Sequence, residues 1–212
     1  MEPEFWHQRW QKNEIGFHES QVNPLLVSHL PALELKPGAR IFLPLCGKTL
    51  DIAWLLEQGY QVVGVELSQL AIDALFQSLD LVPTVINLGP LQHYSALNID
   101  IFAGDIFALT PELLGTVTAT YDRAALVALP TALRERYAAH LAQLTGHAPV
   151  LQITFAYNQA QMDGPPFSVS EAELARLYTG HYQRIALASK LVPGGLRGKT
   201  PAIEAAWLLL PC

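Results

Sequence analysis

Residues 40–68, RIFLPLCGKTLDIAWLLEQGYQVVGVELS, decide the fold. The short apolar run 41–43 is typical of a buried parallel strand, and residues 50–56 space their apolar side chains for a helix packed on that strand. Residues 61–66 return to strand and end on an acid, Glu66. In a doubly wound sheet a ligand lies across the carboxyl ends of the strands, and an acid that ends the second strand can accept hydrogen bonds from ribose hydroxyls. The stretch therefore predicts half of a nucleotide-cofactor site.

Length and composition limit the kind of protein to which this half-site belongs. With 212 residues, 50% of them hydrophobic, the chain can bury one sizeable core. We expect one domain over residues 1–212, with an N-terminal helical lid at 1–30 and an α/β core at 40–212. Cys46 and Cys212 are the only cysteines in the sequence, too few for a disulfide framework or a thiolate zinc site, and we expect no metal.

The charge balance and the hydropathy pattern indicate a small-molecule partner. Thirteen Lys+Arg residues against nineteen Asp+Glu residues give a net charge of −6 without a basic block, which disfavours a nucleic-acid partner. The N-terminus, MEPEFWHQRWQKNE, lacks an apolar signal core, and no run reaches the ~18 apolar residues that a membrane helix needs. We therefore expect a cytoplasmic protein that binds neither membranes nor nucleic acid, and a monomer.

Strands and helices alternate along the rest of the chain. This order predicts an α/β fold with a mostly parallel, Rossmann-like sheet, an antiparallel terminal strand and N-terminal helices that cover the site. The tract 83–97 is rich in turn formers, which predicts a short hairpin or an irregular excursion. The other expected elements are helices at 3–13, 22–30, 70–79, 131–144 and 169–178, strands at 98–102, 117–121 and 150–155, and an antiparallel pair at 182–191 and 203–210.

The turn after the first strand narrows the choice of cofactor. A dinucleotide site would show G-x-G-x-x-G, but Gly47 is the only glycine in this turn, which disfavours hydride-transfer cofactors. A P-loop would need a glycine five positions before Gly47, where Phe42 stands, and this disfavours a nucleoside triphosphate. A cofactor with an adenosine and no phosphates, such as S-adenosylmethionine, needs ribose and adenine contacts but no long glycine cradle. The turn and Glu66 fit such a cofactor.

Six motifs resemble those of the thiopurine S-methyltransferase family, in particular its bacterial members. They are FWHQRW, GFHES, FLPLCGKTLDIAWL, VVGVELS, YDRAALVALP and GPPFSV, and the resemblance covers nearly the whole chain. The resemblance implies the fold of a class I S-adenosylmethionine-dependent methyltransferase. It also implies S-adenosylmethionine as the cofactor and S-adenosylhomocysteine as the product.

The same resemblance implies which residues hold the cofactor. Glu66 would accept both ribose hydroxyls, Leu45 would contact the cofactor through its backbone and side chain, and Trp10 would face the sulfonium through a cation–π contact. Asp105 and Ile106 would hold the adenine. Structural alternatives stay open, such as a helix-capping role for Glu66, a solvated turn for Asp105 and a helix-anchoring role for Trp10.

The substrate side of the site rests on three residues that the resemblance also implies. Arg123 follows a strand and would lie between cofactor and substrate, as a cofactor ligand and as the catalytic residue that stabilises negative charge without accepting a proton. Phe17 would contact the substrate from a loop beside Gly16, and Arg197 is a second candidate for a substrate contact. The alternative for Arg123 is a salt bridge to Asp122 or another acid, worth only ~0–1 kcal/mol at the surface.

These roles predict an S-methyltransferase. It would move the methyl group of S-adenosylmethionine to the sulfur of aromatic or heterocyclic thiols such as thiopurines, by direct in-line displacement. Such thiols are largely ionised near neutral pH, so alignment, worth ~7–11 kcal/mol in favourable cases, can suffice. Trp10, Phe17 and residues 164–167 would form an apolar wall. Two alternatives stay open: methylation of selenium or tellurium species, and binding of S-adenosylmethionine without catalysis.

Overall fold

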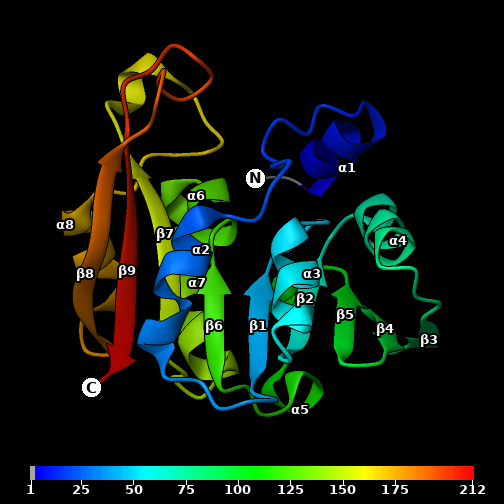
Figure 1. Ribbon diagram of the computed structural model, residues 1–212. Helices are drawn as coiled ribbons and strands as arrows, with labels where there is room; N and C mark the ends of the chain where they lie inside the picture. Colours follow the sequence, from blue (N-terminus) through cyan, green and yellow to red (C-terminus); the bar gives the residue numbers. More distant parts are fainter. Residues whose placement is uncertain (1–2) are drawn as a thin grey trace.

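The structure, a computed structural model that describes residues 3–212, is built on a mixed nine-stranded sheet in the order β3-β4-β5-β2-β1-β6-β7-β9-β8 (Figure 1). Five central strands run parallel, and two antiparallel strands are added at each edge. The Rossmann-like α/β prediction is confirmed. The central strands are β5 (Ile99–Ala103), β2 (Gln61–Glu66), β1 (Arg40–Pro44), β6 (Ala119–Asp122) and β7 (Val150–Ala156), and the edge strands are β3 (Thr84–Asn87), β4 (Gln92–Ala96), β9 (Ile203–Pro211) and β8 (Tyr182–Leu191).

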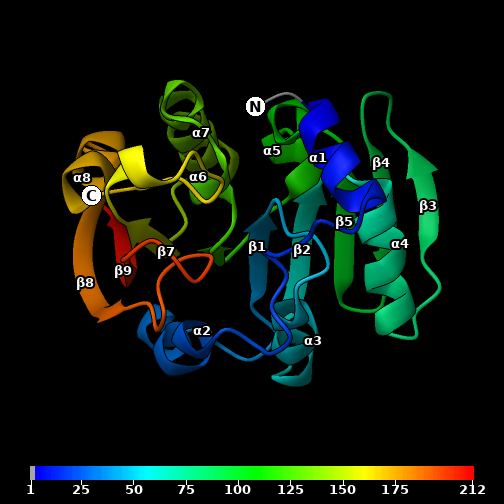
Figure 2. The same cartoon turned by 90° about the horizontal axis from the view of Figure 1, so that it is seen from above.

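Helices cover both faces of the sheet, because a parallel sheet must bury both of its faces (Figure 2). Alternate residues of β1 contact the two layers: Ile41 and Leu43 belong to one core cluster, and Phe42 belongs to the other. One layer contains α2 (Pro24–His29), α3 (Leu50–Glu57) and α4 (Gln69–Ser78), and the other contains α5 (Pro111–Leu114), α6 (Ala125–Ala128), α7 (Thr131–Leu144) and α8 (Glu171–Tyr178).

The carboxyl ends of the parallel strands meet along one edge, which is the upper edge in Figure 1. In the register of β1 and β2, Pro44 pairs with Val65, and in that of β2 and β5, Glu66 pairs with Ala103. The turn after β1, the end of β2 and the loop after β5 therefore lie side by side. Helix α1 (Pro3–Gln11) lies above this edge.

Small polar residues begin the helices that leave this edge. The Thr49 hydroxyl accepts the Asp51 N–H at 3.4 Å at the start of α3, and the Ser68 hydroxyl accepts the Ala71 N–H at 3.4 Å at the start of α4. Such caps satisfy backbone donors that have no partner inside the helix. Because both helices begin so soon after their strands, the connecting turns stay short and remain at the sheet edge.

The predicted helices and strands are confirmed, with ends that differ by at most two residues. The tract 83–97 contains the hairpin of β3 and β4 and is not an irregular excursion. The short helices α5 and α6 were not predicted, because four residues are too few to show a helical period.

The N-terminal 30 residues divide into two parts. Residues from α1 through Glu19 lie at the site edge, whereas α2 packs on the sheet through Leu25 and Leu26. Residues 1 and 2 of the predicted lid lie outside the described residues. Within residues 3–212, no helix combines the length and the apolar character needed to cross a membrane.

Candidate functional site

A cavity of about 980 Å³ opens at the carboxyl edge of the parallel strands, below α1. Its volume is near the upper end of the range for small-molecule sites. The structure brings all the predicted ligand-binding residues to this one cavity, while their contacts with ligands stay predictions. These residues are Trp10, Phe17, Leu45, Glu66, Asp105, Ile106, Arg123 and Arg197.

Glu66 ties together two of the turns that line the cavity. Its Oε2 accepts the Gly47 N–H at 2.8 Å, and its Oε1 accepts the Ser68 N–H at 2.8 Å. Burial raises the pKa of the Glu66 carboxyl, and these backbone hydrogen bonds oppose part of that rise. A carboxylate has about four acceptor positions, so each oxygen can accept one more hydrogen bond. The structural role of Glu66 therefore leaves room for two ligand hydroxyls.

The turn after β1 has an unusual backbone and contacts the lid directly. Leu45 has φ 50°, in the left-handed region that residues with a Cβ rarely adopt, and such strain is often found at functional sites. Gly47 has φ 54°, and a Cβ at this position would lie 3.2 Å from the Trp10 ring. The Trp10 indole thus packs on the turn that is predicted to hold the cofactor.

Four aromatic side chains form the lid side of the cavity. The Phe17 ring centroid lies 5.6 Å from that of Trp10 and 5.6 Å from that of Trp6, and Trp6 lies 5.3 Å from Phe5, all with edge-to-face geometry. Each such pair contributes ~0.5–1.5 kcal/mol beyond area burial. Phe17 nevertheless stays 39% exposed, which leaves apolar surface for an aromatic ligand to cover.

Asp105 and Ile106 differ in their surroundings. The Asp105 side chain is exposed and accepts the Phe107 N–H at 3.0 Å, at the start of the short helix η2 (Ile106–Ala108). Ile106 is buried, and its carbonyl accepts a hydrogen bond from the His140 ring at 2.9 Å. Asp105 is therefore a solvated aspartate in a turn, as in the alternative interpretation, and it also lines the cavity, while Ile106 gives the cavity an apolar wall.

Arg123 is held between two carboxylates. Its Nη1 lies 3.1 Å from Glu19 Oε1, and its Nε lies 3.6 Å from Asp51 Oδ2. Asp122 is instead fully buried and accepts the Tyr137 hydroxyl at 2.7 Å, so it is not the ionic partner of Arg123. Burial alone would lower the pKa of Arg123, but the negative neighbours outweigh it and raise the pKa, so the guanidinium stays charged.

Asp51 anchors this ionic cluster in the core. Its side chain is 1% exposed, and it accepts the Asn23 N–H at 2.8 Å and the Tyr121 hydroxyl at 3.1 Å. Neither Glu19 nor Asp51 was predicted as a site residue from the sequence. Each left a weak signal: Glu19 belongs to the GFHES motif, and Asp51 is an acid inside the apolar run of α3.

The loop between β8 and β9 brings Arg197 to the cavity. Its guanidinium donates to the Pro165 carbonyl at 2.7 Å. Of the predicted wall 164–167, Pro165 and Pro166 line the cavity, whereas the Phe167 ring packs on Gly164. The apolar wall is therefore made in part by the two prolines.

Cys46 lies in the turn after β1, but its thiol is not activated. Burial and the nearby Glu66 carboxylate raise the pKa of Cys46 well above its ordinary value, which keeps the thiol protonated. Among residues 3–212, no group of three or more His, Cys, Asp or Glu side chains is arranged to hold a metal ion.

Comparisons of the sequence point to one family. The sequence profile of the thiopurine S-methyltransferase family matches residues 1–201. A thiopurine S-methyltransferase of Xanthobacter autotrophicus is 54% identical over 210 residues, which cover 99% of both chains. One of Gluconobacter oxydans is 52% identical over 207 residues, which cover 98% of this chain and 94% of the relative.

Solved structures share the fold at low sequence identity. A 1,6-didemethyltoxoflavin-N1-methyltransferase of Burkholderia thailandensis, solved with 1,6-didemethyltoxoflavin and S-adenosylhomocysteine, superposes with a TM-score of 0.65 at 17% identity, over 98% of this chain and 87% of that one. An S-adenosylmethionine-dependent methyltransferase of Anabaena variabilis gives a TM-score of 0.63 at 18% identity, over 98% and 94%. The solved structures show only the fold, whereas the sequence matches identify the family. The chain belongs to the thiopurine S-methyltransferase family.

Proposed function

We propose that this protein transfers the methyl group of S-adenosylmethionine to the sulfur of aromatic or heterocyclic thiols such as thiopurines, by direct in-line displacement. One observation carries the proposal: a single cavity joins the Glu66 turns, an aromatic lid and the charged Arg123. The names of relatives that are more than half identical support the same activity.

The residues on the Glu66 side fit the cofactor. S-adenosylmethionine, when bound, supplies an electrophilic methyl group on a sulfonium sulfur. The two free acceptor positions of the Glu66 carboxylate suit two ribose hydroxyls, and hydrogen bonds to a charged acceptor are strong. The Trp10 indole beside the Gly47 turn suits the sulfonium, because a cation is attracted to an aromatic face.

The residues on the Arg123 side fit the thiol. Phe17, Pro165 and Pro166 offer apolar surface to an aromatic ring and exclude water from it. The Arg123 guanidinium lies at the same cavity and can stabilise a thiolate by charge and hydrogen bonding. Alignment of the two reactants would supply much of the rate enhancement, so no covalent enzyme intermediate is required.

Calorimetric titration of S-adenosylhomocysteine tests the cofactor-binding part of the proposed function. We expect the wild type to bind, and Glu66→Ala to bind at least ~10-fold more weakly, because hydrogen bonds to a charged group are each worth ~1.5–3 kcal/mol. Glu57→Ala is the matched control, since Glu57 is exposed at the end of α3. Absence of wild-type binding would contradict the proposed function. Equal binding by Glu66→Ala would contradict only the role of Glu66.

A further inference from the structure

The ionic cluster at the cavity has no excess positive charge with which to hold a thiolate. Arg123 contributes one positive charge, and the Glu19 and Asp51 carboxylates contribute two negative charges at 3.1 Å and 3.6 Å. A thiolate that approached this cluster would meet a guanidinium already paired on both sides. Neutralisation or displacement of one of the two carboxylates would therefore free more of the Arg123 charge for the anion.

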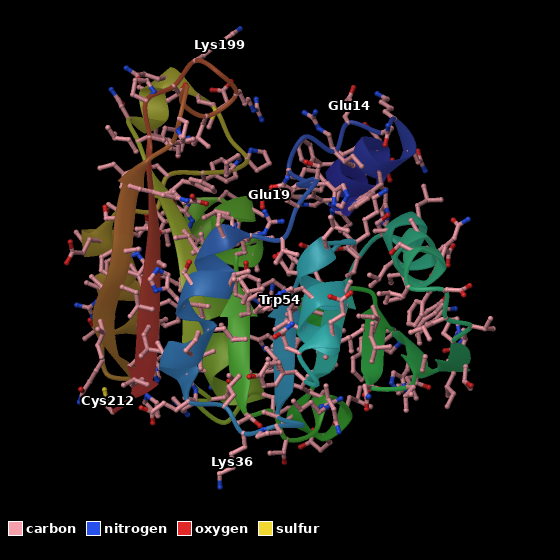
Figure 3. All side chains as sticks on the ribbon, viewed as in Figure 1. Glu14, Glu19, Lys36, Trp54, Lys199 and Cys212 are labelled. Atoms are coloured by element: carbon pink, nitrogen blue, oxygen red, sulfur yellow. The ribbon has the colours of Figure 1, made fainter. Side chains whose placement is uncertain are left out.

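Glu19 is the carboxylate that can change. It lies where the chain runs from α1 down to α2, and it lines the cavity (Figure 3). Its side chain is 43% exposed, and within residues 3–212 it has, besides Arg123, one long hydrogen bond, which it accepts from Asn23 Nδ2 at 3.5 Å. Asp51 is 1% exposed and already accepts two further hydrogen bonds, so it is fixed in place.

The surroundings of Glu19 make it a stronger base than an exposed glutamate. Burial raises the pKa of its carboxyl, and the negative charges of Asp51 on α3 and Glu204 on β9 raise it further. The Arg123 guanidinium and the Asn23 amide oppose this rise without cancelling it. As a carboxylate paired with Arg123, the group can accept a proton at lower cost than an unperturbed glutamate.

We propose that Glu19 is the proton acceptor for thiols that enter the site still protonated, so that the acceptors include weakly acidic thiols as well as ionised ones. This proposal rests on the proposed function. The S–H bond breaks, its electron pair stays on sulfur, and the proton moves to a Glu19 carboxylate oxygen. The thiolate sulfur then bonds to the methyl carbon while the sulfonium carbon–sulfur bond breaks, which leaves a thioether and S-adenosylhomocysteine. Glu19 returns the proton to solvent.

This proton transfer conserves the charge of the cluster. Before it, Asp51, Arg123, Glu19 and a neutral thiol sum to −1, and afterwards Asp51, Arg123, a neutral Glu19 and a thiolate again sum to −1. Arg123 exchanges one anionic partner for another, and no isolated charge forms in the partly buried site. Because Glu19 and the guanidinium are 3.1 Å apart, a sulfur that reaches one is close to the other.

His18 is the competing candidate. It lines the same cavity, but burial and the positive charges of Lys48 and Arg123 lower the pKa of its imidazole, which weakens it as a base. Proton transfer to His18 would also leave the Glu19–Arg123 pair intact, so the guanidinium would not be released to stabilise the thiolate. When Glu19 accepts the proton, the thiol becomes a thiolate and Arg123 is released to stabilise it.

Glu19→Gln tests the proposal with two acceptors. The amide keeps the shape of the side chain and an oxygen for Arg123, but it cannot take the proton. With phenylmethanethiol, which is protonated at neutral pH, we expect kcat to fall by about 10²-fold, the usual scale of general-base catalysis. With 4-nitrothiophenol, which is ionised, we expect kcat to fall by less than about threefold, because no proton must be removed and the uncharged amide no longer competes with the thiolate for Arg123. The dissociation constant of S-adenosylhomocysteine, measured by calorimetry, should change by less than about threefold.

Glu14→Gln is the matched control. Glu14 also lines the cavity, but it lies on the lid and pairs with Arg9 at 2.9 Å (Figure 3). This variant should leave the ratio of the kcat values for phenylmethanethiol and 4-nitrothiophenol unchanged. A ratio that shifts by less than about tenfold in Glu19→Gln, or a selective loss in His18→Gln instead, would overturn the role of Glu19. A wild type that methylates neither thiol would contradict the proposed function itself.

A pH profile of the wild type decides the matter if Glu19→Gln does not fold. With Glu19 as the base, kcat/KM for phenylmethanethiol should be level across the pH range in which Glu19 is ionised and the thiol is still protonated. If only the free thiolate reacted, kcat/KM would rise about tenfold with each pH unit, and this result would overturn the proposal.

Discussion

Replacing Arg123 with methionine should lower stability by about 3 kcal/mol. Glu19 is 43% exposed, so its pair with Arg123 contributes little, on the order of 0–1 kcal/mol. Asp51 is 1% exposed, and removal of the cation from a buried carboxylate costs ~3–5 kcal/mol. The cost should lie at the lower end of this range, because the distance from Arg123 Nε to Asp51 Oδ2 is long, 3.6 Å, and because Asp51 keeps its hydrogen bonds from Asn23 and Tyr121. For a chain of this length, the loss corresponds to a Tm lower by ~6–12 °C.

Thermal unfolding followed by circular dichroism measures this change in stability. A double-mutant cycle tests whether the loss comes from the unpaired charge of Asp51. Adding Asp51→Asn to Arg123→Met should restore part of the lost stability, because no buried charge is then left without its partner. Methyl transfer should fall more than the affinity for S-adenosylhomocysteine. A Tm loss below about 3 °C, or a double variant no more stable than Arg123→Met, would refute the assignment of the cost to Asp51.

Two further predictions concern the turn after β1. Gly47→Ala should weaken S-adenosylhomocysteine binding in calorimetry, because its Cβ would press on Trp10 at 3.2 Å. The control Gly59→Ala has a similar positive φ but open space around its Cβ, and should lose ~1 kcal/mol of stability without losing affinity. Equal affinities in the two variants would contradict the contact. In thiol titration of the native protein near pH ~8, only the exposed Cys212 should react quickly, because its thiol is accessible whereas burial raises the pKa of Cys46. Two fast thiols would contradict this.

The parts of the fold that depend on local patterns could be predicted from the sequence. The strand, turn, helix and strand of residues 40–66 follow from the spacing of their apolar residues. Glu66 and Arg123 could be placed at one edge because each ends or follows a parallel strand, and parallel strands align their carboxyl ends. The lid residue Trp10 came from the family resemblance, not from a pattern in the chain.

The parts that depend on tertiary contacts could not be predicted. Glu19 meets Arg123 only because the segment after α1 descends to the end of β6, and no spacing in the sequence encodes that contact. The left-handed backbone of Leu45 gave no signal, since leucine ordinarily avoids it. Phe167, predicted to line the cavity, packs on Gly164 instead, because the direction of a loop side chain depends on its neighbours.

The most direct test of the central claim is to locate the transferred methyl group. The protein is incubated with S-adenosylmethionine that carries an isotopically labelled methyl group and with 6-mercaptopurine, and the products are identified by mass spectrometry. We expect the label on the sulfur of a methylated thiopurine, with S-adenosylhomocysteine formed in equal amount. Tight binding of S-adenosylhomocysteine without a labelled thioether, or label on a ring nitrogen, would contradict the claim.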